Sequence, residues 1–343
     1  MAQSSPQHEG LPPHAQLIQM ATAYWVSRTV YAAAKLDLAD RLAKGPRSAA
    51  ELAGETGMHA PSLHRLMRTL AALGVLADAG SGRFALTPLG RALQTGAPGS
   101  ARATVLTLAG PLMWRGFEQI MHSLETGKPG FDKAFGMPVF DYLAGHPDEA
   151  SLFSETMVGF HGDEPAAVAD AYDFSRFGTV VDVGGATGNL LAAILAHHPG
   201  PRGILFDLPH VVRDAPAFLK ARGVEGRVSI ESGSFFETVP QGGDAYVLSH
   251  VIHDWSEAQC LTILGHCRAA MRPGGRLLLV EMVLPEGDGM HPGKMLDITM
   301  LVMPGGQERT ATEYGELLDK AGFRLERVVP TASSVSVVDA VRT

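Results

Sequence analysis

The sequence predicts an α/β protein in which a doubly wound, seven-stranded sheet follows a smaller, mostly helical domain. From residue 179 onward, buried strands alternate with helices, which is the pattern of a parallel sheet covered on both faces. Before residue 110 the chain is instead predicted to form helices and one hairpin. The charge changes at the same place, because residues 1–110 carry a net charge of +4 and the remainder carries −12. We therefore expect a domain boundary near residue 110.

The composition indicates a folded globular protein. Of the 343 residues, 45% are hydrophobic and 19% are charged. No apolar run approaches the roughly 20 residues of a membrane span, and the first residues lack the basic and apolar regions of a signal peptide. Cys260 and Cys267 lie on one predicted helix about 10 Å apart, too far to bridge, and no partner gives them metal-ligand spacing. We expect a cytoplasmic protein without a metal site.

The first predicted domain has the elements of a winged helix. An Ala-rich apolar helix is predicted over 14–43. Ser48 is a candidate cap for the next helix, which Gly57 ends. A further helix is predicted over 61–73, and "GVLADAGSGRFALT" (74–87) is typical of a hairpin with glycine at its turn. Such a basic module also allows a DNA-binding regulator, although most of its second helix is apolar and has to be buried.

The second predicted domain carries its strands and helices in alternation. Residues 103–171 are mainly helical with Gly/Pro breaks, and we interpret them as a linker and a lid over the domain that follows. Ligands of such sheets bind beyond the carboxyl ends of the strands. The predicted strands are "TVVDVGG", "GILFDLP", "RVSIESGSFF", "AYVLSHV", "RLLLVEMVL", "FRLERVVP" and "VSVVDAV", the first five of them parallel, and the predicted helices cover 189–198, 214–222, 256–271 and 311–321.

A glycine-rich turn follows the first of these strands in "VVDVGGATGNLLAAIL". Gly184, Gly185 and Gly188 allow a ligand to approach the backbone closely. The spacing fits neither the dinucleotide fingerprint nor the phosphate loop, so a plain tight turn is the alternative. Asp207 ends the second strand 19 residues after Gly188, where an acidic side chain can bind both hydroxyls of a ribose. Turn and carboxylate together indicate a nucleoside.

These segments resemble a known family. The motifs "DVGGATG", "FDLPHVV", "SHVIHDWSEAQ", "PGGRLLLVEMVLPE" and "MLVMPGGQERTATEYGELLDKAGF" occur in the order and spacing of S-adenosylmethionine-dependent O-methyltransferases of the plant caffeic-acid and bacterial antibiotic-pathway type. The resemblance covers about residues 14–343. It implies a Rossmann-like methyltransferase sheet, a winged-helix dimerisation domain at 1–110, and linker helices with the catalytic domain at 111–343, whose core is about 165–343. It also implies a homodimer whose N-terminal helices reach the partner's site.

The resemblance assigns the cofactor, S-adenosylmethionine, to a group of matching positions. Two of them depart from the family pattern: Ser234 stands where the family has an aspartate near the adenine, and Ser249 stands where plant members have lysine. The expected cofactor-binding residues are Asp182, Gly184, Gly185, Gly188, Asp207, Leu208, Gly233, Ser234, Phe235, Ser249 and Trp255.

The same resemblance implies that His253 is a general base, with Glu281 and Glu308 as its flanking acids. A free phenol titrates near 10, so about one in a thousand is ionised at pH 7. A neutral imidazole with a pKa near 6.5 can accept that proton, which is worth roughly 10²–10⁴ in rate. Asp254 is an alternative orienting group, or a helix cap. His250 is assigned no role.

The acceptor pocket is the least determined part of the site. The family's apolar wall around a flat aromatic ring implies a substrate-binding set of Met157, Phe160, His161, Asp254, Met300 and Met303. We therefore expect O-methylation of a hydroxyl, most simply a phenol, on a small aromatic secondary metabolite. The alternatives are a C- or N-methyltransferase of the same family and, outside it, the DNA-binding regulator. We expect no nucleic-acid or membrane partner.

Overall fold

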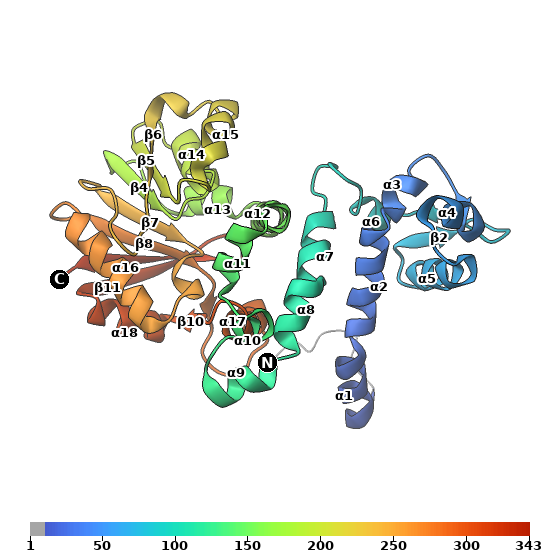
Figure 1. The fold of residues 1–343 in the computed structure, drawn as a ribbon. Helices are drawn as coiled ribbons and strands as arrows, with labels where there is room; N and C mark the ends of the chain where they lie inside the picture. The colour runs from blue at the N-terminus through green and yellow to red at the C-terminus, as the bar shows by residue number, and fades with distance from the viewer. Residues whose placement is uncertain (1–10) are drawn as a thin grey trace. The chain divides into compact units, whose positions relative to one another are not determined.

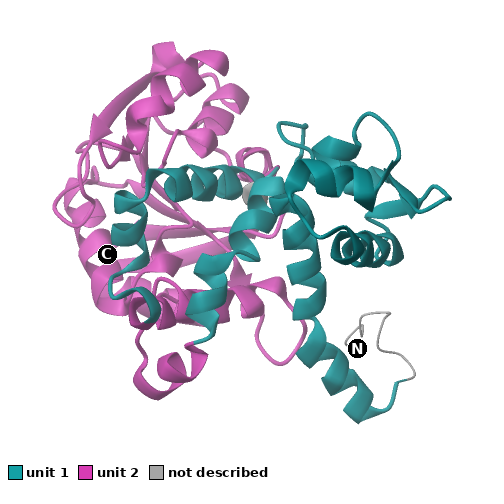
Figure 2. Cartoon of the chain, turned by 45° about the vertical axis from the view of Figure 1, so that its right-hand side comes forward, with its two compact units in different colours: residues 1–118, 134–162 teal, residues 119–133, 163–343 magenta. Residues whose placement is uncertain are grey.

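The computed structural model describes residues 11–343, except for the side chains of residues 160 and 161. The chain divides into two units (Figure 2). The first unit contains residues 1–118 and 134–162, and the second contains residues 119–133 and 163–343. None of the helices within the described residues is long and apolar enough to cross a membrane.

The first unit joins a helical bundle to a three-stranded sheet with strand order β1-β3-β2. The predicted capping box is present, because the Ser48 side chain and Glu51 cap each other's backbone N–H groups at the start of α4. Its strands are β1 (Arg47–Ser48), β2 (Leu76–Asp78) and β3 (Arg83–Leu86), and its helices are α1 (Pro13–Thr22), α2 (Tyr24–Lys35), α3 (Leu38–Leu42), α4 (Ala49–Thr56), α5 (Ala60–Ala72), α6 (Pro88–Arg91), α7 (Arg102–Leu108), α8 (Pro111–Phe117), α11 (Val139–Gly145) and α12 (Pro147–His161).

The prediction of a single helix over 14–43 is wrong in one respect, because the segment forms three helices. The break between α2 and α3 lies at Asp37, whose φ of 51° is left-handed and cannot continue a right-handed helix. The apolar pattern did not reveal this break, since it continues across it. Beyond the break, Leu38 and Leu42 join a core that also contains Leu52, Met67 and Phe84.

The second unit is built on the predicted seven-stranded sheet, with strand order β11-β12-β8-β7-β4-β5-β6 (Figure 1). The five central-to-edge strands β8, β7, β4, β5 and β6 are parallel, as expected, and β12 runs antiparallel between β8 and β11. The strands are β4 (Thr179–Val183), β5 (Arg202–Asp207), β6 (Val228–Ser232), β7 (Ala245–Ser249), β8 (Arg276–Glu281), β11 (Phe323–Pro330) and β12 (Ser336–Arg342).

Helices cover both faces of this sheet and form two cores (Figure 1). The strands alternate between them: Val180 and Val247 contribute to one core, while Val181 and Leu248 contribute to the other. One face is covered by α13 (Glu164–Ala171), α14 (Asn189–His197) and α15 (Ala215–Ala221), and the other by α16 (Glu257–Ala270) and α18 (Ala311–Lys320); the unit also contains α9 (Ile120–Thr126), α10 (Gly130–Phe135) and α17 (Pro292–Val302).

The carboxyl ends of the parallel strands are where the predicted motifs meet. A short parallel ladder between β9 (Val283–Leu284) and β10 (Arg309–Thr310) lies just beyond β8. Its register pairs Arg309 with Val283, so it ties the residues after β8 to the loop before α18. Two glutamates far apart in sequence are thereby brought to one place.

Candidate active site

The turn after β7 positions His253. The chain leaves the strand at Ser249, and His250 then adopts a left-handed φ of 52° while its N–H donates to the Val280 carbonyl. A 3-10 helix follows over Ile252–Asp254, and Ser256 opens α16 with a capping box to Gln259. Ser256 therefore caps α16, and the tight turn places His253 at the end of the sheet.

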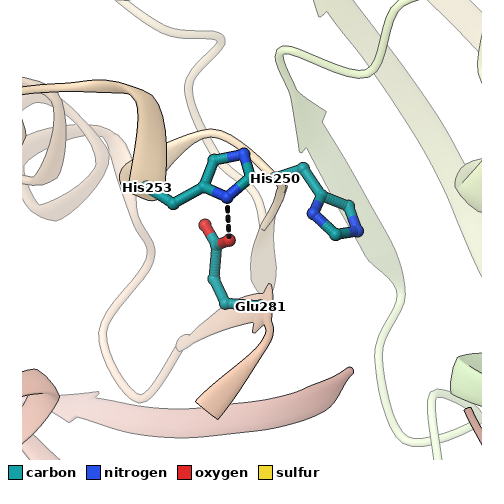
Figure 3. A group of neighbouring side chains, drawn as sticks. All are labelled: His250, His253 and Glu281. Atoms are coloured by element: carbon teal, nitrogen blue, oxygen red, sulfur yellow. Dashed lines mark ion pairs between the residues drawn. The ribbon is translucent and has the colours of Figure 1, made fainter. Parts of the chain in front are cut away.

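His253 lies between the two predicted acids. Its Nδ1 is 2.6 Å from Oε1 of Glu308 and 3.7 Å from Oε2 of Glu281. Figure 3 shows the imidazole of His253 facing the Glu281 carboxylate, which projects from the end of β8. All three side chains are buried. Glu281 is also tied to the turn itself, because its Oε1 accepts the N–H of Ile252 at 3.0 Å.

The loop carrying Glu308 packs its backbone directly on the His253 turn. The N–H of Gln307 donates to the His253 carbonyl at 2.8 Å. A Cβ atom on Gly306 would lie 1.9 Å from that same carbonyl oxygen, so only glycine fits there. The buried Arg309 donates to the Ile252 carbonyl, and Asp297 accepts the N–H of Glu308.

The protonation of His253 differs from the expectation of a neutral ring with a pKa near 6.5. Burial lowers its pKa, but the charges of Glu281 and Asp254 and the hydrogen bond to Glu308 overcome this and raise it to about 10. The expectation used the free side chain, whereas the three carboxylates around the ring favour the imidazolium. The surroundings of the ring therefore stabilise the imidazolium more than water does.

A second histidine–glutamate pair lies beside the first. The ring centroids of His250 and His253 are 5.2 Å apart. Nε2 of His250 is 2.9 Å from Oε2 of Glu164, and the Ser334 hydroxyl donates to the same carboxylate at 2.7 Å. His250, His253 and Glu281 each offer one possible metal-ligand atom within 4.8 Å of the others. However, both rings already have glutamate partners, and these hydrogen bonds account for the arrangement without an ion.

The glycine-rich turn lies over a buried carboxyl group. Asp182 ends β4, and neither of its oxygens has a hydrogen-bond partner among the described residues. A Cβ on Gly185 would lie 2.5 Å from this carboxyl group. Burial and the charge of Asp207 raise the pKa of Asp182 to about 7, and the nearby Leu191 N–H, outside hydrogen-bonding geometry, offsets this only in part.

Asp207 holds the same turn from the neighbouring strand. Its carboxylate accepts the N–H of Ala186 at 2.9 Å and the N–H of Leu208 at 2.7 Å. Burial raises the pKa of Asp207, and these two hydrogen bonds act against the rise. The predicted loop residues and the predicted carboxylate therefore lie together, with Gly188 adopting a φ of 88° at the start of α14.

An aromatic group borders the turn on its other side. Phe235 and Phe236 pack edge-on against Trp255, with ring centroids 5.9 and 4.8 Å from the indole. A Cβ on Gly184 would lie 3.5 Å from Phe235, so this ring reaches the glycine turn. The hydroxyl of Ser234, which is expected near the adenine, accepts the N–H of Phe236 at 3.3 Å.

These features fit the expected cofactor. The carboxyl group of Asp182, which has no hydrogen-bond partner among the described residues, could bind a cationic or polar group. The glycines of the turn allow a ligand to approach the backbone closely, and the aromatic side chains could pack against a base. Phe236 was missed by sequence reasoning, although its neighbour Phe235 was selected. Gly233 precedes this group, Leu208 follows Asp207, and Ser249 ends β7, so these predicted positions also lie at the carboxyl ends of strands.

The predicted acceptor-binding residues are spread over both units. Asp254 lies 3.6 Å from Nε2 of His253. Met300 is buried on α17 and Met303 follows it, next to the loop that carries Glu308. Met157, Phe160 and His161 lie on α12 of the first unit, and the side chains of the last two are outside the described part of the structure. Their role in binding an acceptor stays a prediction.

Sequence reasoning also missed Gly306, Arg309 and the His250–Glu164 pair. The "PGGQERT" motif was a signal for the first two, since it places a glycine and a buried arginine beside a selected glutamate. The third had no local signal, because Glu164 and His250 are 86 residues apart.

Comparison with known proteins assigns both parts of the chain. Residues 117–324 match the model of an O-methyltransferase domain, and residues 18–96 match that of an O-methyltransferase dimerisation domain. The phenazine O-methyltransferase PhzM of Lysobacter antibioticus is 46% identical over 96% of this chain and 96% of its own length. The phenazine-1-carboxylate N-methyltransferase of Pseudomonas aeruginosa is 34% identical over 95% of this chain and 96% of its own.

The solved structures extend this comparison. The O-methyltransferase NcsB1 from neocarzinostatin biosynthesis, in complex with S-adenosylmethionine and 2-hydroxy-5-methyl naphthoic acid, superimposes with a TM-score of 0.83. It is 34% identical, and the match covers 93% of this chain and 96% of that one.

Proposed function

Because this chain belongs to the O-methyltransferase family, whose methyl donor is S-adenosylmethionine, we propose that it methylates a hydroxyl group on a small aromatic secondary metabolite. The hydroxyl is phenolic in this proposal. The arrangement that supports it best is the imidazole of His253, fixed at Nδ1 by Glu308 and Glu281, while Nε2 makes no hydrogen bond among the described residues and has the Asp254 carboxyl group 3.6 Å away. That nitrogen is left for the acceptor oxygen.

In this proposal one group of residues binds the cofactor and another binds the acceptor hydroxyl. Bound S-adenosylmethionine supplies a methyl group already activated by a sulfonium, so the acceptor oxygen is the partner that needs help. Asp182, Asp207 and the aromatic group of Phe235, Phe236 and Trp255 would hold the cofactor. His253 would meet the acceptor hydroxyl, either as the predicted general base when its ring is neutral or as a hydrogen-bond donor when it is protonated.

Methylation of nitrogen is the second candidate. It is supported by the similarity to a phenazine-1-carboxylate N-methyltransferase. The name of that relative gives a phenazine as the molecule it methylates, as does the name of the phenazine O-methyltransferase. An aromatic amine needs no base of the same kind, since its lone pair is available without ionisation. The pairing of His253 with two buried glutamates favours oxygen as the acceptor atom.

We also propose that the enzyme is a homodimer formed through its first unit. That unit matches a dimerisation domain. On α1 and α2 it exposes a run of large apolar side chains that a second copy would cover. These side chains are Leu17, Ile18, Met20, Tyr24, Trp25 and Val26.

The test is a methyl-transfer assay with the purified full chain. The acceptors are a hydroxyphenazine, a hydroxynaphthoate, an aminohydroxybenzoate and a phenazine carboxylate, and the methylated atom is identified by NMR. We expect transfer to oxygen, with kcat reduced roughly 10²–10⁴-fold in His253→Gln and unchanged in His197→Gln, which replaces an exposed histidine paired with Asp170. Transfer to nitrogen alone, or full activity of His253→Gln, would contradict the proposal.

A further inference from the structure

The turn that carries His253 begins with a strained residue. His250 has a φ of 52°, in the left-handed region that residues with a Cβ atom seldom adopt. Its N–H donates to the Val280 carbonyl at 3.1 Å, and the chain then enters the 3-10 helix that contains His253. Backbone strain of this kind persists only where the surrounding structure holds it, and it is concentrated at functional sites. The contacts of the His250 side chain therefore bear on the shape of the turn.

A buried carboxylate holds the side chain of His250. Nε2 of His250 is 2.9 Å from Oε2 of Glu164, the first residue of α13, and the two side chains are 8% and 9% exposed. The other oxygen of Glu164, Oε1, accepts the Ser334 hydroxyl at 2.7 Å. Because each oxygen of the carboxylate has its own hydrogen bond, the orientation of Glu164 is fixed, and the ring of His250 is fixed with it.

The elements that supply these groups are themselves packed in the core. Val168 and Ala169, about one turn after Glu164 on α13, are buried in the same core as Val335, which follows Ser334. The carboxylate therefore projects from a helix that is held on the sheet. The His250–Glu164 pair thus ties the start of the His253 turn to the core of the unit.

This tie acts at a different point of the turn from the contacts around Glu308. The Glu281 carboxylate accepts the N–H of Ile252, and the N–H of Gln307 donates to the carbonyl of His253. Those two contacts hold the middle of the turn, whereas the pair holds its first residue. The rings of His250 and His253 lie beside each other, with centroids 5.2 Å apart (Figure 3). A movement of His250 would therefore displace the ring of His253.

We propose that His250, fixed by Glu164, is a positioning residue for His253. The pair keeps the strained turn in the conformation that presents the imidazole of His253 to the acceptor hydroxyl. This inference rests on the proposed O-methylation, and His250 acts through His253 without touching the reacting atoms. A misplacement of about 1 Å can cost roughly 10²-fold in rate. Loosening the turn should therefore lower kcat while cofactor binding stays the same.

The first experiment measures kcat for a methylated acceptor together with the binding of S-adenosylhomocysteine by calorimetry. In His250→Ala and in Glu164→Ala we expect kcat to fall roughly tenfold or more with an unchanged Kd. Glu164→Gln keeps an oxygen that can accept a hydrogen bond, so it should retain most of the wild-type kcat. Wild-type kcat in both alanine variants would overturn the inference.

His198→Ala is the matched control for these variants. Nε2 of His198 is 3.0 Å from the Ala169 carbonyl, so this partly buried histidine also contacts α13. It follows the last turn of α14, at the opposite end of that helix from Gly188. We expect its kcat to equal that of the wild type. An equal loss of kcat in His198→Ala and His250→Ala would mean that any disturbance of α13 has this effect, and would contradict the positioning role.

A double-mutant cycle separates positioning from a purely structural role. A residue that acts through His253 has nothing to position once that ring is removed. Adding His250→Ala to His253→Gln should therefore cause no further loss of kcat. Loss by the same factor in both backgrounds would place the action of His250 elsewhere and refute the proposal.

A milder variant covers the case in which the alanine variants do not fold. Ser334→Ala removes only the hydrogen bond that orients Glu164. It should lower kcat in the same direction but by less, with normal binding of S-adenosylhomocysteine. If His250→Ala and Glu164→Ala lose S-adenosylhomocysteine binding while Ser334→Ala keeps the wild-type kcat, the pair serves the fold alone and the inference is wrong.

Hydrogen–deuterium exchange examines the same turn without turnover. Peptides that span residues 249–256 should exchange faster in His250→Ala and Glu164→Ala than in the wild type, and at the wild-type rate in His198→Ala. Unchanged exchange in both of the first two variants would overturn the inference, whichever atom is methylated. Faster exchange in them, with no methyl transfer to oxygen from any acceptor, would instead be a failure of the proposed function.

Discussion

At the scale of single residues, Asp182 is the clearest source of a pH effect on folding. Its folded-state pKa of about 7 lies above the ordinary value of 3.8. A carboxyl group with a raised pKa favours the folded state at low pH, and this contribution disappears as the pH rises from about 4 to 7. Asp182 therefore makes the cofactor-free protein less stable at neutral pH than in mild acid.

We expect Asp182→Asn to remove this dependence. The difference in unfolding free energy between variant and wild type should rise between pH 4.5 and 7.5 by about 3 kcal/mol, at about 1.4 kcal/mol for each unit of pKa shift. Urea unfolding without cofactor measures it. Asp214→Asn, at a side chain 76% exposed, is the control. Parallel pH profiles for Asp182→Asn and wild type would show that Asp182 is ionised throughout.

Asp207 gives a prediction about ligand binding. Its carboxylate positions Ala186 and Leu208 of the loops that would hold the cofactor. Charge-assisted hydrogen bonds of this kind are worth about 1.5–3 kcal/mol each. Asp207→Ala should therefore weaken S-adenosylhomocysteine binding at least tenfold in calorimetric titration. An unchanged Kd would remove Asp207 from the cofactor site, and the Asp214→Asn variant again serves as the control.

Single residues were predictable where the motif itself carried the chemistry. His253, Glu281 and Glu308 were selected from the sequence, and they lie in contact. The protonation of His253 was not predictable, because it depends on distances to groups that are up to 55 residues away in the chain. The hydrogen bond that the Ser234 hydroxyl accepts from the N–H of Phe236 was not predicted either, because it depends on the local turn of the backbone.

At the scale of elements, the loop between α17 and α18 is the most sensitive part of the site. A Cβ on Gly306 would overlap the His253 carbonyl, so Gly306→Ala has to push Glu308 away from the ring. We expect a loss of at least tenfold in kcat with little change in S-adenosylhomocysteine affinity. Gly315→Ala on α18 should be neutral, because its Cβ would meet only Leu325 at 3.8 Å. A normal kcat in Gly306→Ala would show that the loop can shift without moving Glu308 away from His253.

The capping box of α18 should contribute measurably to stability. Thr310 accepts the N–H of Glu313, and Glu313 in turn accepts the N–H of Thr310. Thr310→Ala should lower the free energy of unfolding by about 1 kcal/mol. Thr312→Ala, two residues into the same helix, should change it by less than about 0.5 kcal/mol. Equal effects of the two changes in urea unfolding would contradict the capping role.

Elements were predicted best where they are runs of buried apolar residues, as in the central strands of the sheet. The seven strands of the sheet lie where the alternating pattern placed them, and the parallel order of the first five is confirmed. The ladder between β9 and β10 was not predicted, because each strand is only 2 residues long and has no pattern of its own. The break at Asp37 was not predicted either, because the pattern of apolar residues continues across it.

At the scale of the whole molecule, the exposed apolar side chains of α1 and α2 predict self-association. Trp25→Asp places a charge in the middle of this surface and should convert the proposed dimer to a monomer in light scattering. Leu89→Asp, at a side chain exposed to a similar degree on α6, should leave the mass unchanged. A wild-type monomer at micromolar concentration would contradict the proposed dimer.

The placement of His253 and its charged neighbours within one unit has a consequence for how such enzymes diversify. Every group that sets the protonation of the ring belongs to residues 163–343, and none of the described ones belongs to the first unit. A chimera that exchanges the first unit for that of a relative should therefore inherit the acid–base behaviour of this chain. The acid–base groups of residues 163–343 could in this way be inherited together while the rest of the chain diverges.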